Sequence, residues 1–233
     1  MGDMVSESCF TNPYSDKNMS DSGRTTHVSG GKEAILCLQR SSFHPRWPVA
    51  ADGLFGMGER QTHMEFDVVQ GDIAAQSADA LVNAAGTSLK MGSGVAGALR
   101  RAAGRGLNEE AVSKGPVDLG EAAVTDAYEL DAEYVIHAAA MPHYGDGEAT
   151  AESIREATRN ALAAADKRGC SSLVLPALGC GVAGFDLEEG AALIGETIAE
   201  YEPETLEAVE FIAYSDREYE TVRAATELFR NDG

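Results

Sequence analysis

The sequence predicts an α/β fold, a three-layer α/β/α sandwich around a mixed, mostly parallel central sheet. Two observations predict it. From Met64 onward, short apolar runs of strand length alternate with segments of helical spacing, which is the order that builds a sheet covered by helices. Several of these runs are apolar throughout, which is typical of strands buried on both faces.

The predicted elements follow one another in a regular order. Apolar runs predict strands, and these lie at 65–70, 78–85, 121–130, 134–140, 171–178 and 208–215. Apolar residues at helical spacing predict helices at 94–112, 150–169, 186–201 and 216–229. Thr150 or Ser153 is expected to cap the second helix and Gly169 to end it, while Asp186 is expected to cap the third.

The first 63 residues differ from the rest of the chain. Their charges nearly balance, they are rich in Ser, Gly and Asn, and they show no sustained periodicity. We therefore predict that residues 1–63 are disordered, or are an upstream reading of the gene with translation starting at Met57 or Met64. Residues 64–233 are predicted to form the folded domain. The intact mass of the natural protein distinguishes the two interpretations.

The charge of the chain restricts its partners and its location. Asp and Glu number 38 against 18 Lys and Arg, a net charge of −20, which opposes binding to nucleic acid or an anionic membrane. Such an acid excess is typical of proteins from salt-loving archaea. No apolar run has the length of a membrane span and no signal peptide is evident, so we expect a cytoplasmic protein. The four cysteines lack metal-site spacing, and we expect neither a metal nor a cofactor.

Two glycine-rich segments have nearly the same sequence. GSGVAG at 92–97 and GCGVAG at 179–184 both have the G-x-G-x-x-G spacing of dinucleotide-binding loops. A dinucleotide oxidoreductase is disfavoured, because the first segment begins six residues after its strand and no second-strand acid follows. Placed between strands and helices, the two segments instead predict two walls of backbone N–H groups around one diphosphate.

Five motifs in order resemble the macro domain family, whose members bind ADP-ribose. They are QGDI at 70–73, LVNAA at 81–85, GSGVAGALRRAAG at 92–104, YVIHAA at 134–139 and PALGCGVAGF at 176–185. The resemblance spans residues 64–229 and implies a mixed sheet between two helical layers, in agreement with the predicted fold. It also implies that ADP-ribose or an ADP-ribosylated molecule is the partner.

The resemblance implies a role for each matching residue. Asp72 is expected to accept a hydrogen bond from the adenine amino group, beside the backbone N–H of Ile73. Asn83 matches the first Asn of the family's N-A-A-N motif and is the candidate catalytic residue, although an Asn at a strand end is as often structural. The expected contacts to the diphosphate and distal ribose are Gly92, Ser93, Gly94, Val95 and Ala96, faced by Gly179, Cys180, Gly181, Val182, Ala183, Gly184 and Phe185.

Three departures from the family pattern bear on catalysis. Gly86 stands where the family has the second Asn, Ala96 where many hydrolytic members have Asp, and Ala183 where an aromatic residue is usual. We expect a hydrolase that releases ADP-ribose from mono-ADP-ribosylated protein or processes ADP-ribose 1''-phosphate, with a substrate phosphate oxygen as the base. The alternative is a non-catalytic reader of ADP-ribose. A Cys180 thiolate and a core position for His137 are further hypotheses.

Overall fold

A computed structural model describes residues 64–143 and 146–230 of the 233-residue chain. In this part the strands are β1 (Glu65–Gln70), β2 (Ala80–Gly86), β3 (Ala122–Asp126), β4 (Tyr134–Met141), β5 (Ser172–Pro176) and β6 (Ala208–Ala213). They form one sheet in the order β1-β6-β5-β2-β4-β3. Neighbours run parallel except at the edge, where β3 pairs antiparallel with β4. The predicted mixed, mostly parallel sheet is confirmed.

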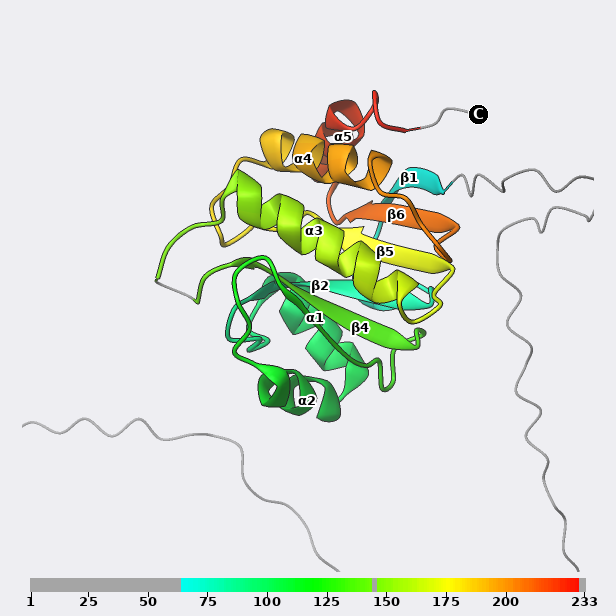
Figure 1. The fold of residues 1–233 in the computed structure, drawn as a ribbon. Coiled ribbons are helices and arrows are strands. Elements are labelled where there is room, and N and C mark those ends of the chain that lie inside the picture. The colour runs from blue at the N-terminus through cyan, green and yellow to red at the C-terminus, as the bar shows by residue number, and fades with distance from the viewer. Residues whose placement is uncertain (1–63, 144–145, 231–233) are drawn as a thin grey trace, which may run out of the picture. The chain divides into compact units, whose positions relative to one another are not determined.

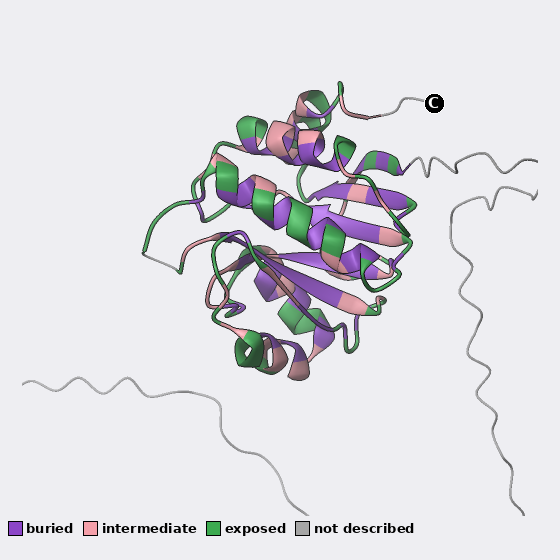
Figure 2. Ribbon diagram, viewed as in Figure 1, coloured by how far each residue is buried: buried purple, intermediate pink, exposed green. Residues whose placement is uncertain are grey.

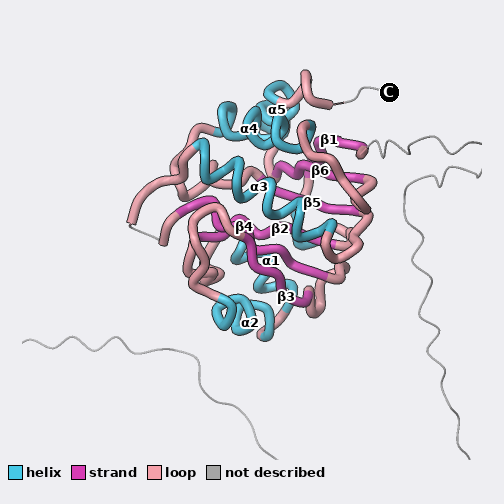
Figure 3. Tube along the Cα trace, viewed as in Figure 1, coloured by secondary structure: helices cyan, strands magenta, loops and turns pink. Residues whose placement is uncertain are grey.

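Helices cover both faces of this sheet (Figures 1 and 3). They are α1 (Gly94–Ala103), α2 (Gly106–Lys114), α3 (Ala151–Asp166), α4 (Leu187–Ala199) and α5 (Asp216–Ala225), with a 3₁₀ turn η1 at Ile73–Ala75. One large core joins α3, α4 and α5 to the sheet, and a second core joins α1 and α2 to its other face. The predicted three-layer sandwich is therefore confirmed.

The central strands supply side chains to both cores. In β2, Ala80 and Val82 pack in the core beneath α3 and α4, whereas Leu81 packs in the core beneath α1. All three are fully buried, as Figure 2 shows for the middle of the sheet. This explains why the strands read as continuous apolar runs.

The predicted N-terminal helix caps agree with the structure, whereas α3 ends at Asp166 with Lys167 as its C-cap, before the predicted Gly169. One predicted helix is divided in two. Thr150 and Ser153 form a reciprocal capping box at the start of α3, and Asp186 Oδ1 accepts from the Glu189 N–H at 3.0 Å to cap α4. The helix predicted over 94–112 is divided into α1 and α2. Gly104, with φ of +83°, ends α1 in a conformation that favours glycine.

The predictions for residues 1–63 fall outside the described residues. Within the described part, no helix is both long and apolar enough to cross a membrane. The described residues also contain no group of His, Cys, Asp and Glu side chains that could hold a metal ion.

Candidate functional site

A cavity of about 430 Å³ opens at the carboxyl ends of the parallel strands. Its walls come from the segments that follow β1, β5 and β6, from the ends of β2 and β4, from one face of α1, and from residues of α4 and α5. Ligands of open parallel sheets bind at this edge, because the loops that leave the strands converge there. The fold thus gathers residues that lie as far apart in the chain as Gly71 and Val222 around one space.

The first glycine segment forms the amino end of α1 and one wall of the cavity. Ser93, Gly94 and Val95 line the space. Gly94 has φ of +59°, which lets the chain turn directly into the helix. Ser93 makes no side-chain cap bond, and the first-turn N–H groups of a helix have no intrahelical acceptor. These N–H groups can therefore bind an anion, favoured by the helix dipole.

The second glycine segment forms the opposite wall. Gly179 and Gly184 adopt φ of +76° and +77°, and the segment is closed by two backbone bonds, from Gly184 N to Gly181 O and from Phe185 N to Gly179 O. Between them, the N–H groups of residues 180–183 donate to no described residue. Consecutive N–H groups in a tight loop form an anion-binding nest.

Cys180 lies within this loop but is not a reactive thiolate. Its Sγ donates to the Leu178 carbonyl at 3.3 Å and packs toward Gly190 of α4. Burial, and next the negative charge of Asp186, raise the pKa of the thiol to about 12. The thiol therefore stays protonated at neutral pH, and the hypothesis of nucleophilic catalysis by Cys180 is not supported.

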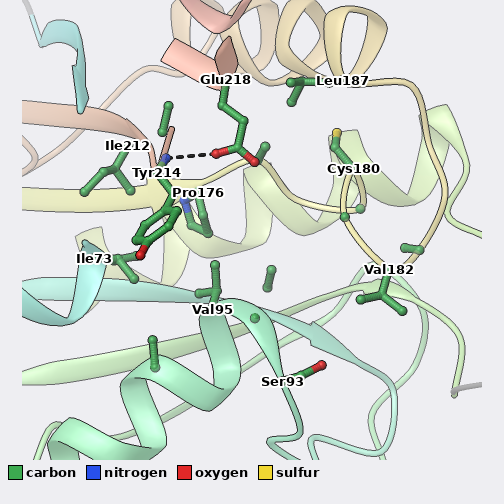
Figure 4. A pocket seen from close by; sticks show the side chains of 18 of the residues that line it. Ile73, Ser93, Val95, Pro176, Cys180, Val182, Leu187, Ile212, Tyr214 and Glu218 are labelled. Carbon is green, nitrogen blue, oxygen red and sulfur yellow. Dashed lines mark hydrogen bonds between the residues drawn. The ribbon is translucent and has the colours of Figure 1, made fainter. Parts of the chain in front are cut away.

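At the other end of the cavity, Figure 4 shows the Tyr214 ring and the Glu218 carboxylate beside the apolar side chains of Ile73 and Ile212. Asp72 and Ile73 line this end, as does Tyr214, a residue that is 76% exposed although it follows a buried strand. Asp72 Oδ1 accepts from the Ala74 N–H at 3.0 Å and caps η1. Glu218 accepts from the backbone N–H groups of Tyr214 and Ser215 and so fixes this corner.

Five predicted site residues lie outside the cavity lining. Ala96 faces the core beneath α1, and Phe185 packs in the core on the other side of the sheet and beside Gly190. Gly92 precedes the helix, and Gly184 lies next to Glu148. The Asn83 side chain lies on the face of the sheet that α1 covers, and the residue is 1% exposed.

Asn83 belongs to a buried hydrogen-bonded chain. Its Nδ2 lies 3.0 Å from His137 Nδ1, and His137 Nε2 lies 3.0 Å from Thr125 Oγ1. Burial lowers the pKa of His137 from 6.5 to about 4, so the ring is neutral at pH 7. His137 is therefore a core histidine, and the structure gives Asn83 a partner in the core instead of a place at the cavity.

Gly86, which stands where the family has its second Asn, has no room for a side chain. A Cβ atom on Gly86 would lie 2.9 Å from the Pro142 carbonyl oxygen, and β2 shifts its register against β4 at this residue. Glycine here allows two backbones to approach closely. The cavity ends nearby at Ala85 and Met141.

Three polar residues of the lining were not among the predicted site residues, namely Arg101, Tyr214 and Glu218. Tyr214 follows the last strand and Glu218 lies in the last helix, both far from the glycine segments in the sequence. A sequence signal existed for Glu218, because Ser215-x-x-Glu218 is a capping box that marks the start of a helix.

Comparisons with known proteins agree with this architecture. Residues 82–194 match the Macro domain family model. A macro domain-containing protein of Chlorobaculum tepidum is 35% identical over 159 residues, which are 67% of this chain and 92% of that protein. An uncharacterised protein of Mycobacterium tuberculosis is 40% identical over 159 residues, 68% of this chain. The chain spans only 44% of that relative's length.

Solved structures of macrodomains also match this chain. An Oceanobacillus iheyensis macrodomain mutant solved with ADPR is 28% identical, with a TM-score of 0.63 over 70% of this chain and 91% of that one. A Trypanosoma brucei macrodomain in complex with ADP-ribose is 29% identical, with a TM-score of 0.61 over 69% of this chain and 68% of that one. The chain therefore belongs to the macro domain family.

Proposed function

We propose that this protein binds ADP-ribose, free or attached to a larger molecule, in the cavity at the carboxyl edge of the sheet. The observation that carries the proposal is that one cavity has a glycine-rich segment with available backbone N–H groups on each side at one end, and an acid with an aromatic ring at the other. ADP-ribose has the matching order of groups, with a diphosphate between a purine and a ribose.

The diphosphate end is lined on two sides by backbone N–H groups. The amino end of α1 presents the N–H groups of its first turn, and the second loop presents the N–H groups of residues 180–183. Such donors are fixed by the fold and need no reorganisation when an anion arrives. This arrangement suits a chain whose net charge of −20 would otherwise repel a diphosphate.

The adenine end offers a hydrogen-bond acceptor and a stacking surface. A carboxylate such as Asp72 accepts from an exocyclic amino group, and the second oxygen of Asp72 has no hydrogen-bond donor among the described residues. The exposed Tyr214 ring stands beside Ile73 in Figure 4. Aromatic rings stack on bases with a gain of about 1–3 kcal/mol.

Hydrolysis of the bound ADP-ribosyl group is the second candidate function, and the lining restricts how it could proceed. Among the described residues at the glycine-loop end, the side chains that line the cavity include the Ser93 hydroxyl and the Cys180 thiol but no carboxylate or imidazole. A reaction here therefore takes a substrate phosphate oxygen as its base. The loss of a protein base typically costs about 10²- to 10⁴-fold in rate, so we expect slow turnover or recognition alone.

Isothermal titration calorimetry with ADP-ribose, ADP and adenosine tests the binding proposal. Gly181 lines the cavity, has an ordinary φ, and has open space where a Cβ would lie. Gly181→Glu should therefore fold normally and weaken ADP-ribose binding by at least about 100-fold, because its carboxylate occupies the anion site. Gly181→Ala adds a methyl group without the charge, and a much smaller loss is expected.

Wild-type protein that gives no heat with ADP-ribose, while thermal unfolding shows it to be folded, would contradict the proposal. Incubation with mono-ADP-ribosylated protein and with ADP-ribose 1''-phosphate then separates the two candidate functions. Release that Gly181→Glu abolishes indicates a hydrolase. Release no faster than in Gly181→Glu indicates a reader.

A further inference from the structure

One cationic side chain lines the cavity within the described part of the chain, and it is Arg101. Arg101 lies in the last turn of α1, seven residues after Gly94 and three after Ala98, both of which also line the cavity. Residues at these spacings share one face of a helix. Arg100 and Arg101 are both exposed, but Arg100, one position earlier on the helix, does not line the cavity.

The guanidinium of Arg101 is directed toward the amino end of α1. A Cβ atom built on Gly97 would lie 3.2 Å from Arg101 Nη1, so the side chain runs back along the helix, as long helical side chains usually do. Gly97 is three residues from Gly94, about 4.5 Å along the helix axis. The positive charge therefore lies within one helical turn of the N–H groups that form the first anion-binding wall.

Arg101 also lacks an ion-pair or hydrogen-bond partner among the described residues. It takes part in none of the three ion pairs of the described residues, and none of these residues forms a hydrogen bond with it. The chain has about two acids for each base, yet this cation is left without a counter-charge beside an anion site. The other charged groups of the lining are Asp72 and Glu218, and Glu218 is engaged with backbone N–H groups.

We propose that Arg101 binds the diphosphate of the ligand and supplies the positive charge that the two backbone walls lack. This inference rests on the proposed function. Arg101 would then determine specificity, favouring adenine nucleotides that carry a diphosphate over the uncharged nucleoside. The contact is charge-assisted and approaches from the side of α1, so it adds to the backbone donors without replacing them.

Arg100 provides a matched control for the experiment. Arg101→Gln and Arg100→Gln each remove one positive charge from the last turn of the same exposed helix end, so their effects on the helix dipole and on net charge are alike. Calorimetry with ADP-ribose is expected to give about tenfold weaker binding for Arg101→Gln and a change of less than about twofold for Arg100→Gln. Arg101→Lys should retain most of the affinity.

The dependence of binding affinity on salt and on the charge of the ligand is a second measurement. Raising KCl weakens binding of ADP-ribose by wild type and by Arg100→Gln more steeply than by Arg101→Gln, because salt screens the contact that Arg101→Gln lacks. Adenosine, which has no phosphate, should bind all three proteins equally. Thermal unfolding of each variant confirms that the helix is intact.

The outcomes are distinguishable. Equal affinities and equal salt dependence for Arg101→Gln and Arg100→Gln, with wild type binding ADP-ribose, overturn the role of Arg101 and leave the proposed function standing. A folded wild-type protein that does not bind ADP-ribose overturns both. A loss in Arg101→Gln that extends equally to adenosine contradicts a contact with the diphosphate.

Discussion

At the scale of single residues, the imidazole of His137 is held by contacts that also fix its proton. Asn83 Nδ2 can only donate, so His137 Nδ1 accepts from it, and His137 Nε2 then donates to Thr125 Oγ1. Thr125 in turn donates to the Val135 carbonyl at 3.4 Å. With the amide oriented in this way, the chain of bonds is satisfied only by a neutral ring, while Asn83 Oδ1 is left without a partner among the described residues.

This arrangement predicts a pH dependence of stability. Burial lowers the folded-state pKa of His137 to about 4, below the unfolded value of 6.5. The unfolded chain therefore binds the proton first, and stability falls as the pH is lowered from about 6.5 to about 4, by about 3 kcal/mol for the full shift. His137→Gln should flatten this limb of the free energy of unfolding against pH, measured by urea titration.

The exposed His143 provides the control for that measurement. His143→Gln should keep the limb between pH 6.5 and 4. An unchanged slope in His137→Gln would show that His137 does not differ in protonation between the folded and unfolded states. The prediction concerns the slope of the unfolding free energy against pH, so it holds even if His137→Gln is less stable at every pH.

We predict that replacing Gly86 by Asn, the residue that the family has at this position, destabilises the fold. In Gly86→Asn the new Cβ lies 2.9 Å from the Pro142 carbonyl oxygen, so the backbone after β4 must move, at a cost of about 1–3 kcal/mol. Gly92→Asn is the matched control, since nothing lies within 4 Å of its Cβ position, and its stability should change by less than about 0.5 kcal/mol. Equal stability of the two variants, together with faster hydrolysis by Gly86→Asn, would contradict the closed position.

At the scale of elements, the predictable features are those with local causes. The six strands, the N-caps of α3 and α4 and the two glycine turns follow from side chains within a few residues of each other, and the structure has them close to the predicted positions. The division of α1 from α2 at Gly104 escaped prediction, because a glycine within a helical pattern is compatible with both a continuous helix and a break. Packing decides between these, and packing is not local.

The same distinction applies to the candidate site. Ser93, Gly94, Gly181 and Val182 were predictable because their segments carry a motif. Arg101 was not, because its place at the cavity depends on how α1 lies against η1 and the sheet edge. A surface arginine and a cavity arginine have the same appearance in a sequence, and only the helix face distinguishes Arg101 from Arg100.

We predict that the hydrogen bonds of Asp166 to the segment between α4 and β6 stabilise the fold. Asp166, at the end of α3, accepts from the N–H groups of Glu204, Thr205 and Leu206 and from the Tyr201 hydroxyl. Burial raises the pKa of Asp166, but these donors outweigh it and hold the pKa below 3.8. Asp166→Asn places an amide donor against such donors and should cost about 1–3 kcal/mol of unfolding free energy in thermal or urea unfolding.

Asp186 is the control for this substitution, because asparagine caps a helix as well as aspartate does. Asp186→Asn should therefore change stability by only a few tenths of a kcal/mol. The contribution of Asp166 is present above pH 3.8 and is lost as the pH falls through its lower folded-state pKa, a window below that of His137. Equal stability of the two Asn variants at pH 7 would contradict the anchoring role.

At the scale of the whole molecule, the net charge of −20 predicts that salt stabilises the fold. Raising KCl from about 0.1 M to about 1 M shortens the Debye length from about 10 Å to about 3 Å and screens repulsion between surface acids. If about 2 kcal/mol of repulsion is removed, the midpoint of thermal unfolding rises by about 4–8 °C.

A variant with fewer surface acids tests the cause of this effect. Glu200, Glu202 and Glu207 are exposed, and replacing all three by Gln should raise the midpoint of thermal unfolding in low salt and reduce its rise with KCl. A midpoint independent of KCl in both proteins would show that the acid excess does not oppose folding.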